Sequence, residues 1–107
     1  MSNAGWLNED GTWNRDHAHK YTKILELDKL LTENNIPHVL QEYMDGWIIY
    51  YPEDGPDRLG DVIEHHMSYD LEAQGFDFPT VEGNLTVEQA YTCFAETHRV
   101  EQIRKKR

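Results

Sequence analysis

Apolar residues between positions 16 and 34 recur every three or four residues: Ile24, Leu27, Leu30 and Leu31. This spacing places them on one face of a helix, with the charged residues between them facing water. Asp16 is suited to the N-cap, Asn34-Asn35 favours a helix end, and Pro37 cannot continue a helix. The pattern predicts a first helix from residue 16 to about residue 34.

Two runs of β-forming residues, 38–44 and 47–51, flank the dipeptide Asp45-Gly46. An Asp-Gly pair between such runs is a strong signal for a two-residue hairpin turn. The expected turn is type I′, which needs a positive φ at both central positions. The sequence therefore predicts two antiparallel strands that turn at Asp45-Gly46.

The chain beyond this hairpin has a weaker pattern. Residues 59 to about 67 contain β-branched residues and are suited to a third strand. Residues 68–84 contain Gly75, Pro79 and Gly83, so we expect an irregular segment with a short helical turn around 70–74.

A capping-box sequence precedes the last apolar stripe. Thr86 is placed to cap a helix and Gln89, three residues later, to bond back to it. The helix that follows is expected to end near Ile103. It has four apolar residues on one face: Val87, Ala90, Tyr91 and Phe94.

The predicted order is helix, three strands, helix, which indicates an α+β domain with both helices on one face of a small antiparallel sheet. We divide the chain into an N-terminal arm (1–15), one domain (16–104) and a basic tail (105–107). Trp6, Leu7 and Trp13 are the residues expected to anchor the arm.

Composition favours a small globular protein of the cytoplasm. A chain of 107 residues forms one domain, and its 11% aromatic content argues against disorder. The single cysteine, Cys93, cannot form an internal disulfide, which fits a reducing compartment. We find no membrane-length apolar run and no signal-peptide pattern.

Charge is distributed unevenly. Residues 30–98 hold fourteen acids and one base, Arg58, whereas residues 99–107 hold five bases and one acid. Such a middle segment repels nucleic acid and anionic lipid and attracts basic protein surfaces. The same helix–strand–helix order occurs in double-stranded RNA-binding domains, but their basic face is missing here. The alternative is that the acidic residues have no specific partner and only keep the protein soluble.

Six histidines raise the question of metal binding, with clusters at His17/His19 and His65/His66. The spacing argues against it, because the first pair diverges on a helix and the second points to opposite faces of a strand. Cys93 lies among apolar residues, and no nucleophile or phosphate-loop motif is present. We therefore expect no catalytic residue, no metal and no cofactor.

The strand 47–51 is bulky on both faces, although a sheet with helices on one side usually has a polar opposite face. Either Tyr50, with Tyr43 or Met44, forms an exposed binding patch, or the arm with Trp6 and Trp13 covers that face.

Five sequence segments between about Ile36 and Ala90 resemble small proteins encoded in phages and prophages of Firmicutes: Asp45-Gly46-Trp47, Tyr51-Pro52, Asp61-Val62-Ile63-Glu64-His65, Ser68-Tyr69 and Val81-Glu82-Gly83-Asn84-Leu85-Thr86-Val87-Glu88. The chain departs from that group in residues 70–79, where it lacks the Leu-rich segment that the resemblance leads us to expect. No catalytic residues carry over from the group. The resemblance implies an accessory phage protein that acts in the bacterial cytoplasm.

These observations together favour a non-enzymatic inhibitor of a bacterial defence system, of the anti-CRISPR type. Its partner would be a basic host protein such as a nuclease effector, without direct binding to nucleic acid or membrane. The candidate contacts are seven acids and two aromatic anchors: Glu42, Asp45, Trp47, Tyr50, Glu53, Asp54, Asp57, Asp61 and Glu64. The alternatives are a binder of a small ligand or nucleotide signal, and a self-associating structural or regulatory phage protein.

Overall fold

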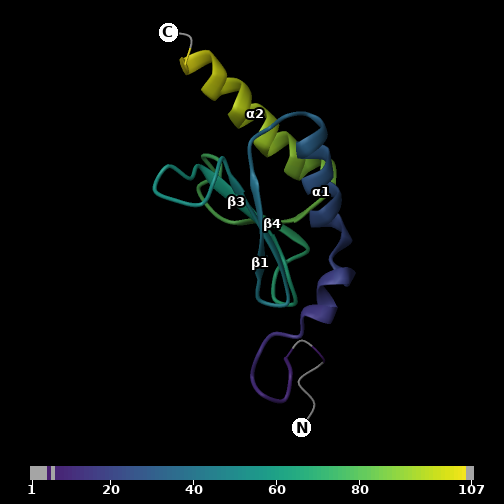
Figure 1. Cartoon of the computed structure of the whole chain (residues 1–107). Coiled ribbons are helices and arrows are strands. Elements are labelled where there is room, and N and C mark those ends of the chain that lie inside the picture. Colours follow the sequence, from purple (N-terminus) through teal and green to yellow (C-terminus); the bar gives the residue numbers. More distant parts are fainter. Residues whose placement is uncertain (1–4, 6, 106–107) are drawn as a thin grey trace.

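The computed structural model of the chain describes residue 5 and residues 7–105, except for the side chain of His17. A 3₁₀ helix, η1 (Arg15–Lys20), precedes the helix α1 (Thr22–Glu33), and a second helix, α2 (Val87–Lys105), ends the fold. Between the helices lie five strands: β1 (Val39–Tyr43), β2 (Gly46–Tyr51), β3 (Gly60–Glu64), β4 (Leu71–Gly75) and β5 (Glu82–Leu85). The predicted α+β class and the two flanking helices are confirmed (Figure 1).

The sheet has five strands, so the prediction of three was wrong. Its order is β1-β2-β3-β4-β5, with every neighbouring pair antiparallel. β4 and all but the last residue of β5 lie within residues 68–84, where we expected irregular chain and a turn of helix. Both strands are short, contain glycine and have few β-branched residues, so their local propensity is weak. They form because β4 pairs with β3 and buries Leu71 and Ala73.

The β1–β2 hairpin forms, but its turn is one residue earlier than predicted. Tyr43 pairs with Gly46, so the turn residues are Met44 and Asp45, and Gly46 belongs to β2. The positive φ falls on Met44, at 54°, and not on Asp45 or Gly46. A Cβ on Gly46 would lie 2.0 Å from the carbonyl oxygen of Glu64, so only glycine allows β2 to lie this close to β3.

The first helix is shorter than predicted because residues 15–20 form η1, capped by Asn14 rather than Asp16. Its predicted end is confirmed. Asn35 has a φ of 56°, its N–H bonds to Thr32 O at 3.2 Å, and Ile36 N–H bonds to Leu31 O at 3.0 Å. These two bonds form a Schellman motif.

The predicted capping box of α2 is also confirmed. Thr86 N–H donates to Gln89 Oε1 at 2.8 Å, and Gln89 N–H donates to Thr86 Oγ1 at 3.0 Å. Each bond satisfies a backbone N–H at the start of the helix that has no partner within the helix.

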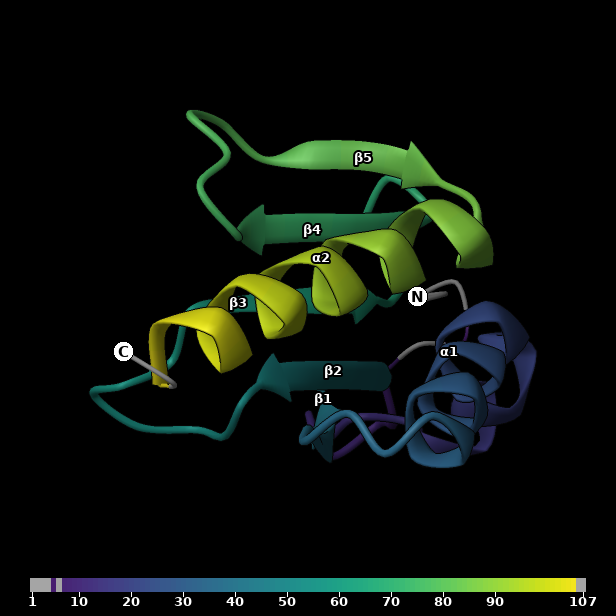
Figure 2. The ribbon, with the colours of Figure 1, turned by 90° about the horizontal axis from the view of Figure 1, so that it is seen from above.

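The core lies between the two helices and one face of the sheet, which we call the inner face. Ile24, Leu27 and Leu31 of α1 are fully buried, as are Ala90 and Phe94 of α2. They pack against inner-face residues of β2, β3 and β4: Ile49, Tyr51, Val62, Leu71 and Ala73. Figure 2 shows α2 lying obliquely over the sheet, roughly along the strands, with α1 beside it.

The opposite face of the sheet, the outer face, carries the alternate residues of each strand. In the register of β2 and β3, Ile48 lies opposite Ile63 and Tyr50 lies opposite Asp61. Ile48 is only 6% exposed although the described helices pack on the other side. No helix in the described part of the chain is long and apolar enough to span a bilayer.

Residues 7–13 form a small loop closed by a bridge between Leu7 and Trp13, and they lie at the end of the molecule opposite the C-terminal half of α2 (Figure 1). Arg15 joins this segment to the hairpin, because its guanidinium donates to Met44 O at 2.9 Å and to Gly46 O at 2.6 Å. Of the expected anchors, Leu7 and Trp13 pair with each other within the arm, and the Trp13 ring also lies 5.7 Å from that of His66. Trp6 is outside the described residues.

Candidate functional site

The nine predicted contact residues fall into three groups. Four acids are exposed: Glu42, Glu53, Asp54 and Asp57. Trp47, Tyr50 and Asp61 are half-buried, whereas Asp45 and Glu64 are buried and do not reach the surface. The structure thus separates an acidic surface from an interior polar cluster.

The acidic surface is centred on the outer face where β2 and β3 meet the loop between them. The guanidinium of Arg58 lies 4.9 Å from the centre of the Tyr50 ring. The same guanidinium is 3.5 Å from a carboxylate oxygen of Asp54 and 3.9 Å from one of Asp61. One cation therefore serves two carboxylates and one aromatic ring.

Asp61 is the most desolvated acid of this surface. Its side chain is 15% exposed, and burial raises the pKa of its carboxyl although the nearby Arg58 charge lowers it. A carboxylate that is destabilised in the free protein gains more from a second cation than a fully hydrated one does.

The loop between β2 and β3 supplies the hydrated part of the same surface. Glu53, Asp54 and Asp57 are exposed there, and in the described residues Glu53 and Asp57 form no ion pair. Glu42 lies elsewhere, on the edge strand β1, where Arg15 Nε is 3.4 Å from its carboxylate.

Trp47 lies on the inner face and not on the outer one. Its indole N–H donates to Ala18 O at 3.2 Å, and the guanidinium of Arg15 lies 4.8 Å from its ring centre. It packs against the core, so Tyr50 is the aromatic residue left on the acidic surface. Trp13 lies at the turn end of the sheet, 5.7 Å from the ring of His66. The side chain that lies over the Tyr50 ring is that of Arg58.

Asp45 and Glu64 have structural partners. Glu64 Oε1 accepts the backbone N–H of Ile24 at 3.1 Å, which satisfies a free amide in the first turn of α1. Burial raises the pKa of the Glu64 carboxyl, although the Ile24 hydrogen bond lowers it. Sequence reasoning assigned both acids to the surface because it counted charges without knowing which faced inward.

The interior cluster is built on Asp45, which is fully buried in the β1–β2 turn. Its Oδ1 accepts hydrogen bonds from the backbone N–H of His66 at 3.2 Å and from His66 Nδ1 at 2.8 Å, and its Oδ2 accepts the hydroxyl of Tyr21. Burial alone would raise the pKa of Asp45, but the bonds from Tyr21 and His66 outweigh it and lower the pKa to about 2. The carboxylate is therefore charged in the interior at neutral pH.

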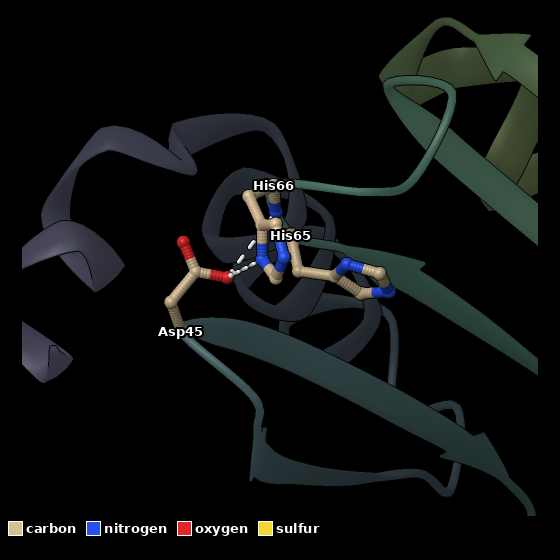
Figure 3. Close-up of side chains that lie close together, drawn as sticks. All are labelled: Asp45, His65 and His66. Atoms are coloured by element: carbon tan, nitrogen blue, oxygen red, sulfur yellow. Dashed lines mark hydrogen bonds and ion pairs between the residues drawn. The ribbon is translucent and has the colours of Figure 1, made fainter. Parts of the chain in front are cut away.

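His65 and His66 lie in the bend after β3, so the expectation that they point to opposite faces of a strand was wrong. Their ring centres are 5.7 Å apart. His65 Nδ1 accepts the backbone N–H of Met67 at 3.0 Å, and burial lowers the pKa of its imidazole. Figure 3 shows the His66 ring facing the Asp45 carboxylate and the His65 ring turned to the other side.

Other reactive side chains stay apart from this cluster. His19 is exposed on η1, and the side chain of His17 lies outside the described residues. Cys93 is half-buried in α2, and burial raises the pKa of its thiol, which disfavours the nucleophilic thiolate. Sequence reasoning missed Tyr21 and Arg15, because neither stands in a motif and both act on residues more than twenty positions away.

Comparison with protein-family models, curated proteins and solved structures gives no significant match. Geometry and charge therefore carry the functional argument.

Proposed function

We propose that the protein is a non-enzymatic binding protein whose acidic surface docks on a basic surface of a host protein. The observation that carries the proposal is the charge imbalance around Tyr50: Asp54 and Asp61 share one cation, and Glu53 and Asp57 of the adjoining loop have no ion pair within the described residues. Lys or Arg side chains of a partner would neutralise these carboxylates.

Tyr50 gives this surface an anchor as well as charge. Its ring is half-buried on the outer face and already stacks with a guanidinium, so it is suited to contact an arginine or an apolar side chain of a partner. Aromatic residues are enriched at the centre of protein–protein interfaces, and the rim of such interfaces is polar.

We further propose that the partner is a nuclease of a bacterial defence system, as in anti-CRISPR proteins. Such nucleases hold nucleic acid in grooves rich in Lys and Arg, and an acidic protein surface competes for the same groove. The resemblance of residues 36–90 to small phage proteins supports this choice of partner.

The lining of the cavity between α2 and the β2–β3 loop argues against the nucleotide-binding alternative. This lining contains Glu53, Asp57 and Glu101 together with one lysine, Lys105, and one histidine, His98. This surplus of carboxylates would repel a phosphate group.

The test is capture of a purified CRISPR effector by the immobilised full-length chain, followed by a DNA-cleavage assay with the captured effector. We expect inhibition of cleavage and association that slows as salt rises from about 50 to 500 mM. Reversal of the loop charges in the double variant Asp54→Lys/Asp57→Lys should slow association without lowering the melting temperature, because both side chains are exposed.

A matched control reverses two exposed acids of α1, Glu26→Lys/Glu33→Lys, which changes the net charge equally but lies away from Tyr50. The proposal fails if both double variants behave alike, or if binding is indifferent to salt. A nucleotide that co-purifies with the protein, or self-association alone, would instead favour the alternatives.

A further inference from the structure

The interior cluster at the turn end of the sheet combines the side chains that transition metals prefer. Asp45, His65 and His66 each offer one ligand atom, and these atoms all lie within 4.8 Å of one another. Two imidazoles and one carboxylate form a common ligand set for divalent zinc, iron and nickel. We propose that these three residues bind one divalent transition-metal ion.

The first two ligand atoms lie close to the required spacing. Asp45 Oδ1 and His66 Nδ1 are 2.8 Å apart, so they would move apart by about 0.5 Å to reach the roughly 3.3 Å between ligands on a tetrahedral ion. The ion would take the place of the proton between these two atoms. A neutral His66 would then carry its single proton on Nε2, and only an imidazolium would release a proton to solvent.

His65 completes the set by a rotation of its side chain. The 4.8 Å limit exceeds by about 1.5 Å the spacing of roughly 3.3 Å between ligands on a tetrahedral ion, so its ring has to turn toward Asp45. His65 follows β3 and lies in a bend outside the strand pairing, but it is only 8% exposed and its ring lies 5.4 Å from that of Tyr43, so the rotation also gives up this ring contact. The bond that it gives up is the one from Met67 N–H.

A supporting shell fixes the carboxylate. Tyr21 donates to Oδ2 of Asp45. The other oxygen, Oδ1, faces His66 (Figure 3). Such hydrogen bonds orient ligands in metal sites. The His66 side chain is 12% exposed and Met67 is 71% exposed, so an ion reaches the cluster from the surface of the β3–β4 turn.

The site lies at the opposite end of β3 from the acidic loop, so the inference is independent of the proposed function. The ion would join the β1–β2 turn, which holds Asp45, to the β3–β4 turn, which holds both histidines. It would therefore stabilise the folded state by an amount that grows with the logarithm of its concentration once this exceeds the dissociation constant.

The test uses the full-length chain without a His tag, treated with EDTA and then titrated with Zn²⁺ by calorimetry and with Co²⁺ by absorbance. We expect one ion per chain and a melting temperature that rises with metal concentration. His65→Gln and His66→Gln should each weaken binding by at least about tenfold, and Tyr21→Phe by about 10- to 100-fold.

His19→Gln is the matched control, because this histidine is exposed and lies outside the cluster. It should leave affinity and the Co²⁺ spectrum unchanged. Each variant is first compared in its metal-free form, so a general loss of folding is separated from a loss of binding. The proposal is overturned if no saturable one-to-one binding occurs, or if His65→Gln and His66→Gln, folded when metal-free, bind as the wild type does.

Discussion

At the scale of single residues, three acids of the same chain occupy different environments. Asp45 is buried with donors on both carboxylate oxygens, and its pKa falls to about 2. Glu64 accepts one backbone amide, and Asp61 has only a distant guanidinium, so burial raises the pKa of both carboxyls. The number and charge of the donors, and not burial alone, decide the sign of each shift.

The substitution Asp61→Asn tests this conclusion through the pH dependence of stability. A folded-state pKa above the ordinary value favours the protonated form, so Asp61 contributes stability below its unfolded-state pKa and loses it as pH rises through the folded-state value. The neutral variant should therefore melt at a higher temperature than the wild type at pH 7, with the difference vanishing in acid. Thermal unfolding between about pH 3 and 7 measures this.

Asp57→Asn serves as the control, since this acid is exposed and should show no such difference. A lower melting temperature for Asp61→Asn at pH 7 would mean that attraction to Arg58 outweighs burial.

At the scale of elements, the β1–β2 hairpin depends on the close approach of β2 to β3 at Gly46. Arg15 fixes the turn through the carbonyls of Met44 and Gly46, and Asp45 ties the same turn to His66 and Tyr21. Both sets of bonds require Asp45 to lie in the turn and Gly46 to lie in β2. This explains why the turn is displaced from the Asp-Gly dipeptide that marked it in the sequence.

Gly46→Ala should separate β2 from β3. The added Cβ would meet backbone atoms of Glu64 and His65, which cannot rotate away, so we expect a loss of about 3 kcal/mol in the free energy of unfolding. Gly11→Ala is the comparison, because nothing lies within 4 Å of its Cβ and only its φ of +87° opposes the change. That variant should lose about 1 kcal/mol. Equal losses in urea unfolding would refute the close-approach argument.

At the scale of the whole molecule, two helices distant in sequence share one core with the sheet. Phe94 of α2 is fully buried and lies 4.9 Å from the ring of Phe76 and 6.0 Å from that of Tyr51. Leu27 of α1 is fully buried in the same cluster. The core therefore holds both helices on the inner face of the sheet.

Phe94→Ala and Leu27→Ala should each destabilise the fold by about 2–5 kcal/mol, because each leaves a cavity among packed side chains. Chemical unfolding measures the loss. Ile103→Ala provides a control on the same helix, since Ile103 is 47% exposed, and it should change stability by less than about 0.5 kcal/mol. A small effect at Leu27 or Phe94 would show that the core lies elsewhere.

The sequence by itself determined the elements whose signals are local. The apolar stripe of α1, the Asn34-Asn35 end and the Thr86–Gln89 capping box depend on residues three to five positions apart, and each is present in the structure. The existence of the hairpin follows for the same reason.

Only the tertiary structure decided the rest. β4 and β5 have weak propensities and form through pairing with a neighbouring strand, which no local pattern records. The burial of Asp45 and Glu64 depends on Tyr21, Ile24 and His66, residues 21 to 40 positions away. Net charge was readable from the sequence, but packing decided which carboxylates are exposed and which face the interior.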